Sequence, residues 1–136
     1  MVTYVLDSSA LLRFLDDEAG AARVSEIIAS HLQGGCEAII PAPQWGEIAG
    51  IICKKRGRKA MELTLARLSA FGLRVVVVDA DRSVRAALIK TERDLPYIDA
   101  FAVELAAESR DRVLVTADFD FKAVSKNIEI EFLPTK

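Results

Sequence analysis

The 136-residue chain starts with the stretch VTYVLDSS at positions 2–9, in which a short apolar run ends at an acidic residue, Asp7. A run of this length, followed by residues that favour helix starts, is typical of a buried strand that leads into a helix. The pattern recurs, because short β-branched runs alternate with longer segments of helical periodicity along the chain. This alternation predicts an α/β fold in which helices cover both faces of a mainly parallel sheet.

The predicted architecture is a three-layer α/β/α sandwich around a five-stranded sheet. Strands are expected at positions 2–7, 37–40, 75–78, 112–116 and 128–132. Helices are expected at 8–15, at 21–32, from Pro41 through the segment that carries Glu47, at 59–71, at 81–93 with Asp81 as N-cap, and at 97–109. No repeat, low-complexity tract or linker interrupts the pattern, so a single domain over residues 1–136 is expected.

Composition narrows the class of protein. Hydrophobic residues make up 51% and charged residues 28% of the chain, which indicates a folded globular protein. No apolar run approaches the roughly 20 residues of a membrane span, and no secretory signal precedes the first strand. We therefore expect a cytoplasmic protein that does not use a membrane. Cys36 and Cys53 lack metal-ligand spacing and are expected to be reduced, buried thiols.

Several kinds of catalytic and nucleotide-binding site are excluded because the residues that they need are absent from the sequence. His31 is the only histidine, so a pair of imidazoles cannot act as acid and base. It lies near a predicted helix C-terminus, where the helix dipole favours histidine, and a structural role is expected. A P-loop and a Gly-rich dinucleotide motif are both absent.

Four acidic residues lie in apolar surroundings, where a lone carboxylate is costly to bury. Asp7 and Asp118 follow predicted strands, whereas Glu47 and Asp99 lie on apolar faces of predicted helices. Ligands of open α/β sheets bind at the carboxyl ends of strands. A cluster of carboxylates there favours Mg²⁺ or Mn²⁺, with one ion or two, and metal-activated water as the nucleophile.

Each acid also has a structural explanation when it is considered alone. Asp7, Asp118 and Asp120 are all placed to cap a helix or turn, and Asp99 suits the dipole of a helix N-terminus. Glu47 is harder to explain in this way, because it has no cap position and no basic residue one turn away. Four independent accidents at one edge of a sheet are less plausible than a shared cation.

The chain resembles the PIN-domain ribonucleases, and within them the VapC-type toxins of toxin–antitoxin pairs. The matching stretches are VLDSSAL at 5–11, PAPQWGE at 41–47, LPYIDAF at 95–101 and LVTADFDF at 114–121. They span nearly the whole chain in the order of the family. The resemblance implies a parallel sheet covered by helices, Mg²⁺- or Mn²⁺-dependent endonucleolytic cleavage of RNA, a homodimer, and inhibition by a small antitoxin protein.

The resemblance also assigns residues. The acidic quartet of the family matches Asp7, Glu47, Asp99 and Asp118, so these four would be both catalytic and metal-binding. Asp7 and Asp99 would be the main metal ligands, Asp118 the next, and Glu47 would act partly through water. Ser9 and Thr116 match positions that support the acids by hydrogen bonding, and the role of Asp120 is left open.

Positive charge for an RNA substrate is concentrated in one run, KKRGRK at positions 54–59. These cations could neutralise phosphates, or they could simply belong to a solvent-exposed turn between helices and stabilise a helix C-terminus. They are Lys54, Lys55, Arg56, Arg58 and Lys59. Arg13, on the helix that begins beside Asp7, is a further candidate for RNA binding. Two other functions stay open: a Mg²⁺-binding signalling domain of the receiver type, and an RNA-binding protein with a vestigial site.

Overall fold

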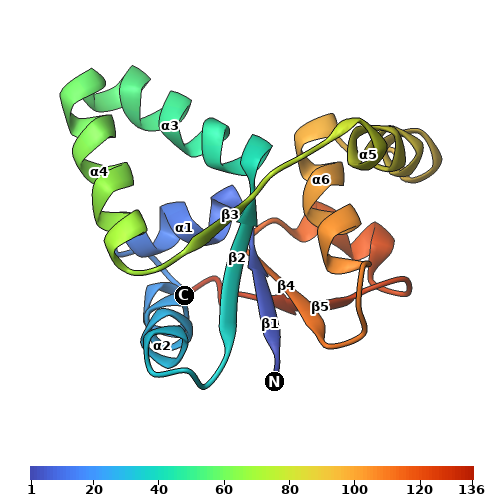
Figure 1. Cartoon of the computed structure of the whole chain (residues 1–136), viewed down its shortest axis with the longest axis horizontal. Coiled ribbons are helices and arrows are strands. Elements are labelled where there is room, and N and C mark those ends of the chain that lie inside the picture. The colour runs from blue at the N-terminus through green and yellow to red at the C-terminus, as the bar shows by residue number, and fades with distance from the viewer.

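Five parallel strands form the centre of the protein in the computed structural model, which describes all residues from 1 to 136 (Figure 1). Their order across the sheet is β3-β2-β1-β4-β5. The strands are β1 (Thr3–Leu6), β2 (Glu37–Pro41), β3 (Arg74–Val76), β4 (Arg112–Thr116) and β5 (Glu129–Phe132). The predicted α/β class and the five-stranded parallel sheet are confirmed.

Helices form a layer on each face of the sheet, as predicted. They are α1 (Ser8–Leu15), α2 (Ala21–Leu32), α3 (Ala42–Arg56), α4 (Arg58–Ala70), α5 (Ala80–Arg93), α6 (Tyr97–Ala106) and the 3₁₀ helix η1 (Phe119–Val124). The hydrophobic core has two parts, one on each face of the sheet, because successive side chains of a strand point to opposite faces. Leu6, Ile40 and Val115 pack under α1–α4, whereas Val5 and Leu114 pack with α6 and η1.

Some predicted boundaries are wrong. Helix α5 is capped by Asp79, whose Oδ1 accepts the backbone N–H of Arg82 at 2.9 Å, and not by Asp81. Helix α6 ends at Ala106 and not at position 109. Strand β3 stops at Val76, before the end of the predicted run at 75–78. The short helix η1 was not predicted at all.

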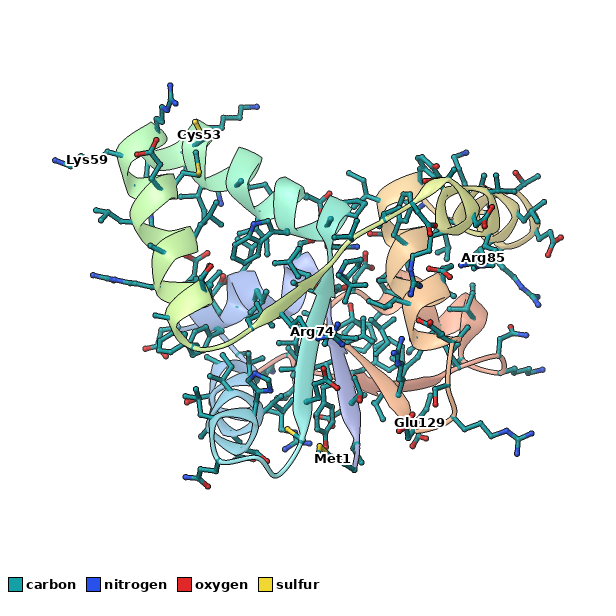
Figure 2. All side chains as sticks on the ribbon, viewed as in Figure 1. Met1, Cys53, Lys59, Arg74, Arg85 and Glu129 are labelled. Atoms are coloured by element: carbon teal, nitrogen blue, oxygen red, sulfur yellow. The ribbon has the colours of Figure 1, made fainter.

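The predictions for cysteine and histidine have different outcomes. Cys36 is buried, but Cys53 is exposed on the outer side of α3, so the prediction of two buried thiols is wrong for Cys53 (Figure 2). The imidazole of His31 joins three segments: its Nε2 donates to the carbonyl oxygen of Gly72 at 2.8 Å, and its Nδ1 accepts from Ala38 N at 3.1 Å. These bonds tie α2 to β2 and to the turn before β3, so the structural role is confirmed.

The order in which the chain adds strands to the sheet reverses between β1 and β4. From β1 the chain moves outward through β2 to β3, and it then returns to the other side of β1 to form β4 and β5. Such a switch point leaves a crevice at the carboxyl ends of the two strands. Figure 1 shows the helix pairs α3–α4 and α5–α6 on either side of this edge. None of the helices is both long enough and apolar enough to cross a bilayer.

Candidate functional site

A cavity of about 430 Å³ lies at the switch point and brings together the four acidic residues that the sequence singles out. Asp7 comes from the end of β1, Glu47 from α3, Asp99 from α6 and Asp118 from the loop after β4. The complete lining is Asp7, Ser8, Ser9, Glu47, Pro96, Tyr97, Ile98, Asp99 and Asp118. No lysine or arginine lines this cavity, so nothing in its wall balances the negative charge.

Asp7 is the most buried of the four acids, with only 2% of its surface exposed. Its Oδ1 accepts hydrogen bonds from Ala10 N at 2.9 Å and Ser9 Oγ at 2.7 Å, and its Oδ2 accepts one from Thr116 Oγ1 at 2.5 Å. Burial raises the pKa of Asp7 to about 6, although the hydrogen bonds from Thr116, Ala10 and Ser9 oppose this rise. Asp7 therefore caps α1 and also lines the cavity, so the two explanations of this residue are compatible.

Thr116 and Ser9 connect the ends of the two central strands. Besides donating to Asp7, Thr116 Oγ1 accepts the backbone N–H of Asp118 at 3.0 Å. Ser9 Oγ accepts the backbone N–H of Ala117 at 2.9 Å and lies 3.2 Å from Thr116 Oγ1. The two hydroxyls thus hold the acid after β1 against the loop after β4, which is how supporting residues orient a site.

Glu47 is held by Ser8, and Ser8 is held in turn by Gln44; sequence reasoning missed both residues. The Ser8 hydroxyl donates to Glu47 Oε1, and the Ser8 backbone N–H donates to Gln44 Oε1 at 2.8 Å. The Gln44 amide also donates to the carbonyl oxygen of Ile98 at 3.1 Å. One signal for Gln44 exists in the sequence, since it precedes Glu47 by three residues and shares its helix face.

Asp99 lies in the first turn of α6, where its charge is close to two other acids. Burial, followed by the negative charges of Asp118 and Glu47, raises the pKa of Asp99 to about 6. Asp118 caps η1, because its Oδ1 accepts the backbone N–H of Asp120 at 2.9 Å. Asp120 is exposed and does not line the cavity, but its charge also contributes to the raised pKa of Asp99.

The chemistry of the donor set fits a hard divalent cation. The charged groups of the cavity wall are all carboxylates, joined by the hydroxyls of two serines, and oxygen donors of this kind suit Mg²⁺ or Mn²⁺. The mutual repulsion seen at Asp99 is what a cation would relieve. However, no three Asp, Glu, His or Cys side chains of the chain stand in an arrangement that could hold an ion. The acids share a cavity without forming a finished ligand cage.

The candidate RNA-binding residues lie outside this cavity. Lys54, Lys55, Arg56, Arg58 and Lys59 are all exposed at the tip where α3 meets α4, and Figure 2 shows Lys59 pointing away from the body of the protein. Arg56 pairs with Asp16 at 3.4 Å and Arg58 with Glu62 at 3.0 Å. Arg13 donates to the carbonyl oxygen of Ala19 at 3.3 Å and does not line the cavity.

Strand order separates this protein from receiver domains. The doubly wound fold of receivers has the order 2-1-3-4-5, whereas this sheet has the order β3-β2-β1-β4-β5. No lysine lines the acidic cavity, and only residues 133–136 follow the last strand. The receiver-like alternative is therefore wrong.

Known structures of low sequence identity share the fold. The DNA-bound VapBC of Salmonella typhimurium superposes with a TM-score of 0.74 at 16% identity, over 97% of this chain and 98% of that one. VapBC2 of Rickettsia felis, bound to a DNA fragment from its promoter, gives 0.75 at 15% identity, over 98% and 100%. VapC20 of Mycobacterium tuberculosis, a toxin that cleaves the sarcin-ricin loop, gives 0.66 at 16% identity, over 96% and 99%.

Sequence comparison assigns the family directly. No curated protein sequence matches the chain significantly. The PIN domain family, however, matches residues 4–127, a range that includes β1 from its second residue, β2, β3, β4 and all four acids of the cavity. The chain therefore belongs to the PIN domain family.

Proposed function

We propose that this protein is a metal-dependent endoribonuclease and the toxin of a toxin–antitoxin pair. The observation that carries the proposal is the cavity at the switch point, which four carboxylates line without any cationic side chain. Membership of the PIN family and the likeness in fold to VapC-containing structures support it. Together they favour a nuclease over an RNA-binding protein with a vestigial site, because no acid of the quartet is missing.

The residues that would hold Mg²⁺ or Mn²⁺ are Asp7, Asp99 and Asp118, with Glu47 beside them. When bound, such a cation polarises a phosphoryl group and activates water for attack on it. Glu47 is oriented for a role in positioning that water, because Ser8 holds its Oε1 and no protein group donates to its Oε2. Asp7 is fixed by three donors, which makes it the most rigid of the four carboxylates.

The tip of the α3–α4 hairpin would bind phosphates of the RNA away from the cleaved bond. Lys54 to Arg56 follow Glu47 on the same helix by seven to nine residues. At a helical rise of 1.5 Å per residue, this places them ~10–14 Å further along the axis of α3. Exposed cations at that distance suit electrostatic contacts to the backbone of a bound strand, independent of base sequence. Arg13 is a less favoured contact, because its guanidinium is used within the protein.

Cleavage of RNA by purified protein tests the nuclease proposal. We expect wild type to cut a mixed cellular RNA pool with MnCl₂ or MgCl₂ and not with EDTA, and Asp99→Asn to be inactive while folded. An Asp120→Asn variant is the matched control, because Asp120 is acidic and nearby but outside the cavity. Metal-independent cleavage, or full activity of Asp99→Asn, would contradict the proposal.

Salt dependence tests the RNA-binding tip separately. Replacing Lys54, Lys55, Arg56, Arg58 and Lys59 by serine should weaken RNA binding and flatten the slope of log K against log [salt]. The binding assay uses the inactive Asp99→Asn background, so that RNA stays intact. An unchanged slope would remove the tip from the RNA site.

We further propose an antitoxin partner and a homodimer. A groove between the C-terminal part of α1 and the α3–α4 hairpin is lined by Leu12, Leu15, Ile51 and Ile52, with charged residues at its rim, and suits an amphipathic segment of an antitoxin. On α5, Val84 and Leu88 are 60% and 55% exposed and one helical turn apart, which suits contact with a second copy. Light scattering of wild type and Leu88→Glu tests the dimer, which the variant should disrupt.

A further inference from the structure

Gln44 is a fully buried amide where α1, α3 and α6 meet. Its exposed surface is 0%, although glutamine is usually an exposed residue. Both ends of the amide are used, since Oε1 accepts the backbone N–H of Ser8 at 2.8 Å and Nε2 donates to the carbonyl oxygen of Ile98 at 3.1 Å. A buried amide is retained only where such partners compensate for its lost hydration.

Each contact of Gln44 is adjacent to an acid of the cavity. Ser8 directly follows Asp7, Ile98 directly precedes Asp99, and Gln44 itself lies one helical turn before Glu47. The bonded residues are 36 and 54 positions away from Gln44 along the chain, so these are true tertiary contacts. One side chain therefore connects the three backbone segments from which three of the four acids project.

Ser8 strengthens the same connection to α3. Its backbone N–H is one of the first in α1, which have no acceptor inside their own helix, and Gln44 supplies that acceptor. Its hydroxyl donates to Glu47 one turn further along α3. Ser8 thus contacts α3 at two successive turns, and loss of the Gln44 bond would leave Glu47 as its only polar contact there.

We infer that Gln44 is a positioning residue that sets the spacing of Asp7, Glu47 and Asp99, and thereby the ability of the cavity to bind a divalent cation and cleave RNA. The inference rests on the proposed nuclease function. Gln44 does not line the cavity, so it acts through Ser8 and Ile98 and not by touching the substrate. Groups that orient ligands in this way typically affect metal affinity or activity by about 10- to 100-fold.

The test replaces Gln44 by methionine, which has a similar length but cannot form either hydrogen bond. Ile27→Val is the matched control, because Ile27 is a buried residue of α2 that packs in the core and lines neither the acidic cavity nor the proposed antitoxin groove. Two readouts are needed: Mn²⁺ affinity by isothermal titration without RNA, and the single-turnover cleavage rate as a function of enzyme concentration.

We expect Gln44→Met to weaken Mn²⁺ binding and to slow the saturated cleavage rate by about 10-fold or more. The concentration for half-saturation with RNA should stay within about twofold, because the basic tip is untouched. Ile27→Val should match wild type in both readouts at a comparable loss of melting temperature. If Gln44→Met fails to fold, Gln44→Asn replaces it, since an amide one methylene shorter cannot reach Ser8 and Ile98 together.

The outcomes separate the inference from the function on which it rests. Wild-type Mn²⁺ affinity and cleavage rate in the folded Gln44 variant would overturn the positioning role and leave the nuclease proposal intact. Equal losses in the Gln44 and Ile27 variants would also overturn it, because a general loss of stability would then explain both. If wild type does not cleave RNA, the nuclease proposal fails, and the Mn²⁺ titration alone decides the role of Gln44.

Discussion

Replacing Asp7 by asparagine is expected to stabilise the metal-free protein at neutral pH. Burial raises the pKa of Asp7 from its ordinary value of 3.8 to about 6. Because the folded state binds this proton more tightly than the unfolded state, stability falls as pH rises from about 4 to about 6. The full loss, about 3 kcal/mol, is present at pH 7. Asparagine carries no charge, so the variant does not suffer this loss of stability.

Rearranged hydrogen bonds reduce this gain. Asparagine can keep the acceptor that Ser9 Oγ and Ala10 N use, but its Nδ2 would face the Thr116 hydroxyl, which now donates to Asp7. That hydroxyl can turn toward Ser9 Oγ, 3.2 Å away. We take the cost of this exchange as about 1 kcal/mol. The variant should therefore be about 2 kcal/mol more stable than wild type at pH 7 and about 0.5 kcal/mol less stable at pH 4.

Urea unfolding followed by circular dichroism measures both quantities. Wild type and Asp7→Asn are compared in EDTA at pH 4, 5, 6, 7 and 8 with constant ionic strength. A variant that is less stable than wild type at pH 7, or a difference that does not change between pH 4 and pH 7, would refute the reasoning. Repeating the pH 7 measurement with MnCl₂ adds a check, because a ligand of the folded state should raise the stability of wild type more than that of the variant.

Three further predictions concern other parts of the fold. Glu104 is 6% exposed and pairs with two arginines, so Glu104→Ala should cost about 3 kcal/mol in urea unfolding, and a loss below 1 kcal/mol would contradict a buried pair. Gly20 has φ +93° and a built Cβ would lie 2.9 Å from the Leu133 Cβ, so Gly20→Ala should lower the melting temperature by several degrees, as calorimetry can check. A thiol reagent should label exposed Cys53 within minutes and leave Cys36 protected until the protein unfolds, which peptide mass spectrometry would show.

The strands and helices could largely be predicted because their periodicities differ. The limits of the prediction have physical causes in the sheet itself. The run at 75–78 has strong β preference throughout, but only Arg74–Val76 have a partner, because β2 ends at Pro41 opposite Val76. Val77 then leaves the sheet, and the strand ends two residues earlier than its composition suggests. Asp79 is consequently the first acid able to cap the next helix, ahead of Asp81.

The acids of the site could be predicted, and the family resemblance indicated Ser9 and Thr116, which both bond to Asp7. The roles of Ser8 and Gln44 could not be predicted. A carboxylate in an apolar run is visible in the sequence, because burying it is costly. A glutamine or a serine in the same context is not unusual, so nothing marks Gln44 or Ser8 as bonding partners across 36 residues. Helical periodicity gives the face on which Gln44 lies, and only the packing of α1 and α6 against that face determines what it meets.

The central position of β1 has a consequence for synthesis of the protein on the ribosome. One neighbour of β1, β2, emerges soon after it, but the other neighbour, β4, begins only at Arg112. The nascent chain must keep its first strand half-paired until that late segment leaves the exit tunnel. Asp118 and the Thr116 hydroxyl arrive at the same moment, so the acidic cavity cannot be assembled on a partly translated chain. The nuclease activity proposed above would thereby be absent until translation of the chain is nearly finished.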